Sequence, residues 1–249
     1  MIERIKKSQM KIVIASALFI AITYIPLFMS PSVVEAFVNE DMIFESLTAI
    51  YFFITCLLLG IAFFRLQPPP GDKKYYVLKK LSLMTLAVLF FVAAGEEISW
   101  GQRIFNIETP ESIKQVNVQD ELTIHNLDFF QGENATLDFS QLQTLFSLAF
   151  VFLLPLGALV IQRLLKFDLR AIVPIVPIQV GLLALLNYII QKILRNIVEV
   201  VPNLYQHSIM PFTEGLYEVR EHGHAYAMML AVFFYLLFEL YPAREESRP

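Results

Sequence analysis

The stretch LSLMTLAVLFFVAAGEEISW, residues 81–100, decides the fold. It carries no charged side chain before Glu96, and a helix of about 20 residues is long enough to cross the roughly 30 Å hydrocarbon core of a bilayer. Its end holds Glu96, Glu97 and Trp100. Two carboxylates at a membrane boundary are costly unless they are paired or hydrated, and tryptophan is typical of that boundary. The stretch therefore predicts a transmembrane helix with a polar end at the membrane boundary.

The rest of the chain repeats this pattern. Of its 249 residues, 56% are hydrophobic and 17% are charged, which is typical of a protein surrounded by lipid. The alternating segments of a membrane β-barrel are absent from the sequence, so we expect an all-α, polytopic membrane helical bundle that forms a single domain, residues 1–249. About six transmembrane helices are expected, with approximate spans 11–30, 43–64, 81–100, 142–161, 171–190 and 225–241.

Basic residues predict the orientation of these helices. Cytoplasmic loops of membrane proteins are enriched in Lys and Arg, and most of the 19 Lys and Arg residues lie in alternate connections and at the two ends of the chain. Both termini are therefore expected in the cytoplasm. The two long connections, residues 101–141 and 191–224, are expected on the non-cytoplasmic side.

The remaining composition limits the classes of binding partner that we expect. The single cysteine, Cys56, lies in an apolar run, so the chain forms no internal disulfide. No basic patch interleaved with aromatic residues points to nucleic acid. The expected partners are the lipid bilayer and a lipid or membrane-borne substrate.

The first cluster of candidate functional residues ends the third span. Glu96 and Arg103 are seven residues apart and share a helix face if the helix continues past Gly101, whereas Glu97 points about 100° away. One interpretation is a structural salt bridge between Glu96 and Arg103. The other makes one of the carboxylates a metal ligand or a general base.

The second cluster lies in the first outer connection. Thr109 and Pro110 predict the start of a short helix, and a second helix is expected over residues 117–127. There Glu121 and His125, four residues apart, would share one face. His125 is interpreted either as a hydrogen-bonded histidine at the interface or as a metal ligand or acid–base group.

The third cluster begins the last helix. Glu214, Glu218 and His222 follow at intervals of four residues and stack along one helix face. This face is either the solvated start of the helix or a set of ligands, because carboxylates and neutral imidazole bind zinc. Asn187 and Gln191 in the fifth span and Glu45 in the second bring further polar groups to the same leaflet. Buried polar groups in a membrane need partners, so this convergence favours a single site.

One block of the chain resembles a known group of proteins. GEEISWGQ, residues 95–102, followed by NVQDE, residues 117–121, and by His125 and Asn126, is similar to a block of uncharacterised bacterial multi-pass membrane proteins. The resemblance covers about residues 90–130. It implies a bacterial cell (inner) membrane protein and carries no known activity.

Two characterised groups offer weaker analogies. CAAX-type intramembrane proteases have paired glutamates followed by an arginine four residues after the first, whereas here the arginine is Arg103 and no matching F-x-x-x-H follows. Alkaline-ceramidase-like hydrolases hold zinc at a membrane face with serine, aspartate and histidines. Ser46, His125, His222 and His224 resemble such a set in type, but their spacing differs.

The leading hypothesis is a metal-dependent hydrolase that acts at the outer membrane interface. Glu97, His125, Glu218 and His222 would bind zinc or another divalent metal, whose bound water becomes a nucleophile near neutral pH. Glu96 would be the general base, and Arg103 would bind a phosphate or a developing anion. Two alternatives remain open: a transporter of a small ion or solute, with Asn187 and Glu239 as further steps of its path, and a non-catalytic scaffold or assembly protein.

Overall fold

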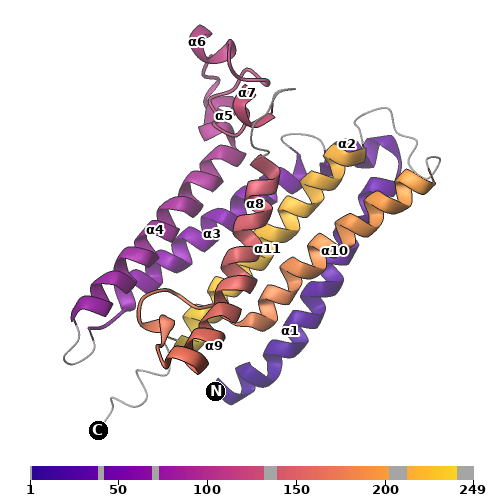
Figure 1. The fold of residues 1–249 in the computed structure, drawn as a ribbon. Coiled ribbons are helices and arrows are strands. Elements are labelled where there is room, and N and C mark those ends of the chain that lie inside the picture. Colours follow the sequence, from indigo (N-terminus) through magenta and orange to yellow (C-terminus); the bar gives the residue numbers. More distant parts are fainter. Residues whose placement is uncertain (1, 39–41, 69–72, 132–138, 202–211, 240–249) are drawn as a thin grey trace.

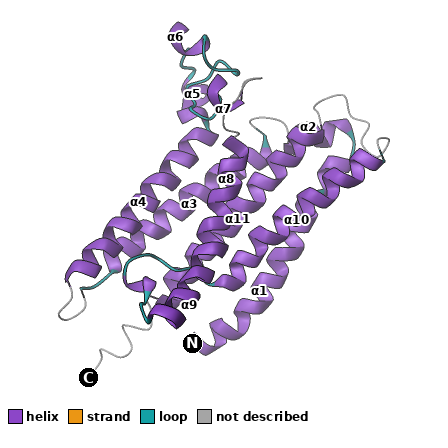
Figure 2. Ribbon diagram, viewed as in Figure 1, coloured by secondary structure: helices purple, strands orange, loops and turns teal. Residues whose placement is uncertain are grey.

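The structure is a computed structural model that describes residues 2–38, 42–68, 73–131, 139–201 and 212–239. These residues form helices, and their only β-type pairing is an isolated bridge between Asn117 and Leu127. The long elements lie side by side as a bundle, with short helices gathered at one end (Figure 1, Figure 2). The α-helices are α1 (Ile2–Thr23), α2 (Pro31–Val38), α3 (Ile43–Arg65), α4 (Lys73–Glu97), α5 (Gln102–Phe105), α6 (Glu111–Lys114), α7 (Asp128–Gln131), α8 (Phe139–Leu148), α9 (Leu154–Leu165), α10 (Ile178–Val200) and α11 (Phe212–Glu239). The remaining helical elements are η1 (Ile25–Phe28), η2 (Ser99–Gly101), the π-helical η3 (Ala149–Leu153) and η4 (Leu169–Ala171).

Five segments of the described chain are long and apolar enough to cross a membrane. They are Ser8–Phe28, Pro31–Arg65, Lys73–Glu97, Phe139–Leu165 and Ile178–Val200. The prediction of an all-α polytopic bundle is therefore confirmed. The sixth predicted span, 225–241, falls on α11 as far as Glu239, and its last two residues lie outside the described residues. α11 is not among the five segments, and the first half of this helix carries Glu218, Arg220 and His222.

The central element of the bundle is α11. Many of its side chains are fully buried, including Leu216, Val219, Ala231 and Phe234, and it packs against α3, α10 and α8. The surrounding helices instead expose large apolar side chains, such as Leu18 on α1 (62% exposed). Lipid is the solvent that satisfies such an outer surface. The helix that carries the buried Arg220, His222 and His224 is thus shielded from lipid by its neighbours.

The turn between α8 and α9 shows how sequence shapes this packing. Pro155 has no N–H, so the carbonyl of Val151 lacks the donor four residues later that an α-helix provides, and the chain forms the π-helical η3 here. On α10, Gly181 fits against this turn: a Cβ atom on it would lie 2.1 Å from the Val151 carbonyl oxygen. Only glycine therefore lets α10 approach η3 so closely.

The short helices α5, α6 and α7 form an outer lobe, residues 98–131, beyond the end of α4 (Figure 1). The condition for a shared face of Glu96 and Arg103, a helix that continues past Gly101, is not met, because Ser99, Trp100 and Gly101 all have positive φ angles (48°, 54° and 75°) and turn the chain. The predicted helix over residues 117–127 is also wrong. Here Asn117 accepts hydrogen bonds from the backbone N–H groups of Gln119 (3.0 Å) and Glu121 (3.2 Å), which favours turns over helix.

Two details of the predicted connections also differ. The short helix after Thr109 is present as α6, but Pro110 is its N-cap residue and Thr109 bonds elsewhere. The second outer connection is shorter than the predicted 191–224, because α10 continues to Val200 and α11 already begins at Phe212.

Candidate functional site

Polar side chains meet where the outer ends of α3, α4, α8, α10 and α11 come together, the end of the bundle that carries the lobe. The carboxyl group of Glu97 lies close enough to several others to be affected by their charge. These neighbours are Glu221, Glu218, Glu45 and Glu96, in decreasing order of effect. Glu45, Glu97 and Glu218 come from three segments that are distant in the sequence, and a common site formed by them remains a prediction.

Glu97 lines a cavity of about 230 Å³ between α3, α4, α8 and α11, which we call the outer cavity. Its polar lining is Glu96, Glu97 and Gln143, and the buried Oε1 atom of Gln143 has no hydrogen-bond partner in the described chain. The remaining lining is apolar: Phe52, Leu89, Phe90, Ala93, Phe139, Leu142, Phe146 and Met228. The α4 residues that line the cavity extend from Leu89 to Glu97, about 12 Å along the helix. The cavity is therefore amphipathic and lies along the last turns of a membrane-spanning helix.

Glu96 has a different environment from Glu97, although the two are adjacent. Its buried carboxylate accepts hydrogen bonds from Trp100 Nε1 (2.7 Å), the backbone N–H of Ile124 (2.6 Å) and the backbone N–H of His125 (3.1 Å), and it lies 3.3 Å from His125 Nδ1. A carboxylate with so many donors is well suited to hold structure in place. Glu96 attaches the outer lobe to the end of α4; as a general base it remains a prediction.

His125 lies beside the outer cavity and not deep within the bundle. Its ring packs on Phe139, a residue of the cavity wall, with 5.4 Å between ring centroids, while its Nδ1 faces Glu96. Its predicted helical partner Glu121 instead accepts a hydrogen bond from Ser99 Oγ (2.6 Å). Glu96 therefore orients His125 toward the rim of the cavity.

The predicted interaction of Arg103 lies outside what the structure describes, because the placement of this side chain is not given. Its backbone belongs to α5, beyond the positive-φ turn that ends α4. The argument that Glu96 and Arg103 share a helix face therefore does not apply, since α4 ends at Glu97.

His222 is fully buried among aromatic rings. Its ring centroid lies 4.7 Å from that of Phe44, 5.3 Å from Tyr51 and 6.0 Å from Phe19. Neither ring nitrogen has a well-formed hydrogen bond within the described residues. Glu214, which is exposed, and Glu218, which is near Glu97, lie on the same helix as His222. The ring of His222, however, is surrounded by side chains of α1 and α3.

A hydrogen-bond network that the sequence did not reveal links several helices of the bundle. The buried Arg220 donates through Nη2 to the Ser140 carbonyl (3.1 Å) and to Ser140 Oγ, which also bonds to Glu221. The Arg220 carbonyl accepts from Asn187 Nδ2 (2.7 Å), and Tyr24 donates to Asn187 Oδ1 (2.7 Å). This network joins the residue between α1 and η1 to α8, α10 and α11. Gly223 was a sequence signal of this contact, because its missing side chain leaves room for Asn187.

The polar groups stop about halfway along α11. His224 Nδ1 lies 3.1 Å from Ser147 Oγ, and Tyr226 bonds to Ser16 (2.8 Å). The next eight residues, AMMLAVFF (227–234), are apolar. Of the predicted transport steps, Asn187 belongs to the outer network and the side chain of Glu239 is not described. Between Tyr226 and Tyr235, α11 therefore carries no polar side chain that could continue a path through the bundle.

The four predicted metal ligands do not form one ligand group. His125 faces Glu96 at the rim, His222 lies among aromatic rings, and Glu218 is near Glu97. Among the described residues, no group of three or more His, Cys, Asp and Glu side chains is arranged to hold a metal ion. Zinc or another divalent metal at this site remains a prediction.

Comparison of the chain with protein-family models, curated proteins and solved structures gives no match. The chemistry of the site therefore has to be argued from its own residues.

Proposed function

We propose that this chain is a membrane-embedded hydrolase whose substrate is an amphiphile, such as a lipid or a lipid-linked molecule. The observation that supports it is the position of Glu97 at the polar end of an otherwise apolar cavity. The apolar walls would take part of an acyl chain, since ligand sites are mostly apolar with a few placed polar groups. The polar head would then lie at Glu97 and Gln143.

In the proposed reaction Glu97 is the general base. Its carboxylate takes a proton from water while the water oxygen forms a bond to the carbonyl carbon of a substrate ester. The amide N–H of Gln143 would donate to the developing oxyanion. When the carbon–oxygen bond to the alcohol breaks, Glu97 returns the proton to the leaving alkoxide. The products are a carboxylic acid and an alcohol, and Glu97 is regenerated.

The surrounding charges favour one kind of head group. Glu45 and Glu218 add negative charge near Glu97, whereas the charge of Glu221 is offset by Arg220, whose Nη2 lies 3.8 Å from Glu221 Oε1. A head group rich in hydroxyl or amino donors suits this setting better than an unaccompanied phosphate. A divalent metal held by Glu97 and Glu218 would also offset these charges. It is a separate proposal, tested by metal analysis of the purified protein.

The test is turnover of methylumbelliferyl esters by the full chain reconstituted in lipid nanodiscs. Replacing Glu97 by Gln should lower kcat by at least about 100-fold, the usual contribution of a general base. The matched control is Glu214→Gln, because Glu214 is an exposed glutamate at the start of α11. Wild type should also prefer long acyl esters over short ones. Equal turnover by wild type and Glu97→Gln, or none with any ester, would contradict the proposal.

Of the two alternatives, assembly has the more specific support. The outer lobe exposes Ile104 (73%) and Phe105 (72%), and exposed apolar groups of this kind are typical of interaction surfaces. Transport is less favoured, because α11 carries no polar side chain between Tyr226 and Tyr235. If esters are not turned over, the lobe becomes the first region in which to seek function.

We also propose that the lobe lies on the non-cytoplasmic side of a bacterial cell membrane. The distribution of basic residues and the resemblance of residues 90–130 support this orientation. A cysteine at position 115 of the lobe should react with an impermeant reagent from outside intact cells, and one at position 166 only after lysis. The reverse pattern would contradict the orientation.

A further inference from the structure

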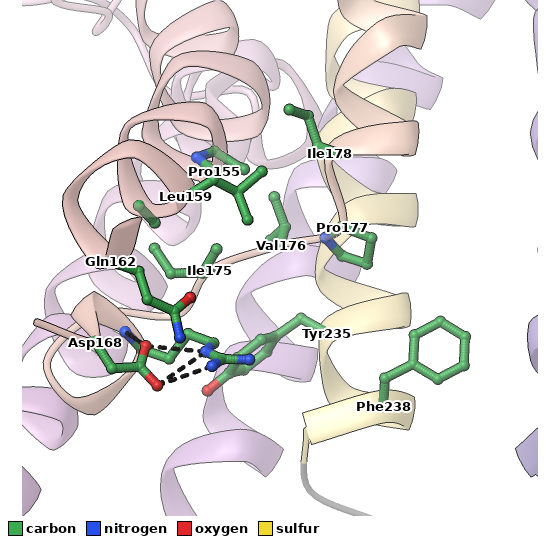
Figure 3. A pocket seen from close by; sticks show the side chains of 12 residues that line it. Pro155, Leu159, Gln162, Asp168, Ile175, Val176, Pro177, Ile178, Tyr235 and Phe238 are labelled. Carbon is green, nitrogen blue, oxygen red and sulfur yellow. Dashed lines mark hydrogen bonds and ion pairs between the residues drawn. The ribbon is translucent and has the colours of Figure 1, made fainter. Parts of the chain in front are cut away.

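A second cavity, of about 260 Å³, lies at the opposite end of the bundle from the lobe; we call it the inner cavity. It is enclosed by α9, η4, the start of α10 and the end of α11. Figure 3 shows Pro155, Leu159 and Ile178 at one end and Asp168, Gln162 and the hydroxyl of Tyr235 at the other. The cavity therefore joins an apolar interior to a polar mouth.

The mouth is built around an ion pair. Arg170 Nη2 lies 2.9 Å from Asp168 Oδ2, and Arg170 Nε donates to Asp168 Oδ1 at 2.9 Å. Both side chains are 46% exposed, so the pair is accessible from the surface. The arginine hydrogen bond and the positive charge nearby keep the pKa of Asp168 below its usual range, and it is ionised at neutral pH.

Neighbouring residues make this mouth basic. The segment RLLKFDLR, residues 163–170, carries three basic residues and one acidic residue. Lys79 of α4 is close by: its Nζ lies 5.7 Å from the ring centroid of Tyr235, and its charge acts on Asp168. Ser82 holds α4 against this region through a hydrogen bond to the Ile172 carbonyl (2.8 Å). An anionic group is the complementary partner for such a mouth.

We propose that the inner cavity binds an anionic phospholipid, with part of an acyl chain inside it and the phosphate at Arg170. A guanidinium binds phosphate through the same paired hydrogen bonds as carboxylate. The lipid phosphate therefore competes with Asp168 for Arg170. This site is separate from the proposed hydrolase site and does not depend on it.

The competition predicts opposite effects of two neighbouring substitutions. Phosphatidylglycerol binding to the full chain in neutral detergent is titrated by native mass spectrometry, with phosphatidylcholine of the same acyl chains for comparison. Arg170→Gln should weaken phosphatidylglycerol binding about tenfold, the effect of a charged hydrogen bond worth about 1.4 kcal/mol. Asp168→Asn should strengthen it, because the variant lacks the carboxylate that competes with the lipid phosphate for Arg170, while Asn still accepts the backbone N–H that caps η4.

The chain offers a matched control in Arg195. This exposed arginine forms a similar pair with Glu199 (2.9 Å) on α10, near the other end of the bundle. Arg195→Gln should leave phosphatidylglycerol binding unchanged. Equal losses for Arg170→Gln and Arg195→Gln, or weaker binding by Asp168→Asn, would overturn the proposal.

Two further probes identify the ligand. Phosphatidylglycerol with short, six-carbon chains should bind more weakly than the long-chain lipid, because it leaves the apolar interior unfilled. Equal affinity would overturn the acyl-chain assignment. Inorganic phosphate in the millimolar range should not displace the lipid; full displacement would indicate a site for free phosphate and overturn the lipid assignment.

Discussion

The two ends of the bundle have cavities of similar size and opposite charge. The outer cavity ends at Glu97 with other carboxylates nearby, whereas the inner cavity ends at Arg170 among basic residues. The two ends also differ in which elements supply their charged side chains. At the outer end the charged groups come from several helices and form a buried network, but the ion pair of the inner mouth joins residues two apart in one exposed segment. Disruption of long-range contacts should therefore have larger effects than changes at the inner mouth.

The largest expected effect is that of Gly181→Ala, which adds one methyl group where α10 meets η3. The new Cβ would lie 2.1 Å from the Val151 carbonyl oxygen, and backbone there has little freedom to move. We expect the free energy of unfolding to fall by about 3 kcal/mol, the upper range of overpacking. Because Val176 and Ile178 precede Gly181 and line the inner cavity, lipid binding at that end should fall as well.

Gly157 on α9 supplies the control for this change. A Cβ at Gly157 meets no atom within 4 Å, so Gly157→Ala should be neutral or stabilise the protein by about 0.5–1 kcal/mol through helix propensity. Thermal unfolding of both variants in the same detergent measures the difference. If the two variants melt together, the close approach of α10 to η3 is wrong.

The second-largest effect is expected for Glu96→Gln, and the loss of stability should be confined to the outer lobe. Glu96→Gln replaces a carboxylate that accepts from Trp100 and from two backbone N–H groups by a weaker, neutral acceptor. Hydrogen bonds to charged groups are worth about 1.5–3 kcal/mol. Hydrogen exchange at the amides of Ile124 and His125 should therefore accelerate by about tenfold to a hundredfold. The membrane-spanning helices should keep their protection.

A comparison with Glu111→Gln isolates this role of Glu96. Glu111 is exposed and lies 3.8 Å from Lys114 within α6, so its loss should change lobe exchange little. Unchanged exchange in Glu96→Gln would show that other contacts attach the lobe to α4. Exchange that rises throughout the bundle would show that Glu96 supports more than the lobe.

Much of the bundle could be predicted from the sequence, because apolar length is a direct signal of a membrane span. The concentration of polar groups at one end was also readable, from Glu45, Glu97 and Glu218. The lobe was not: Ser99 and Trp100 adopt positive φ angles that their residue types disfavour, so Gly101 alone did not indicate how sharply the chain turns after α4. Spacing alone predicted helix there, and side-chain bonds to the backbone overrode it.

The different environments of Glu96 and Glu97 could not be predicted either. Adjacent residues of a helix point about 100° apart, but the sequence does not say which neighbour each will meet. The donors to Glu96 come from residues 100, 124 and 125, and their approach depends on the fold of the lobe. His222 had the spacing of a ligand, whereas its aromatic neighbours lie on α1 and α3, far away in sequence. Long-range packing of this kind leaves no local pattern.

The smallest effect should come from the ion pair of the inner mouth, and its sign follows from the pKa of Asp168. The Arg170 hydrogen bond lowers this pKa in the folded protein below the unfolded value of about 3.9. The pair therefore stabilises the fold above about pH 4 and loses that contribution as the pH falls through the lowered pKa. Because both side chains are nearly half exposed, water screens the pair and the contribution should be only a few tenths of a kcal/mol. In lipid-free detergent, Asp168→Asn should melt slightly below wild type at pH 7, and the difference should shrink toward pH 3. A difference that stays constant over this range would mean that the charge of Asp168 does not stabilise the fold, and Arg170 would then be less restrained than the competition with lipid phosphate requires.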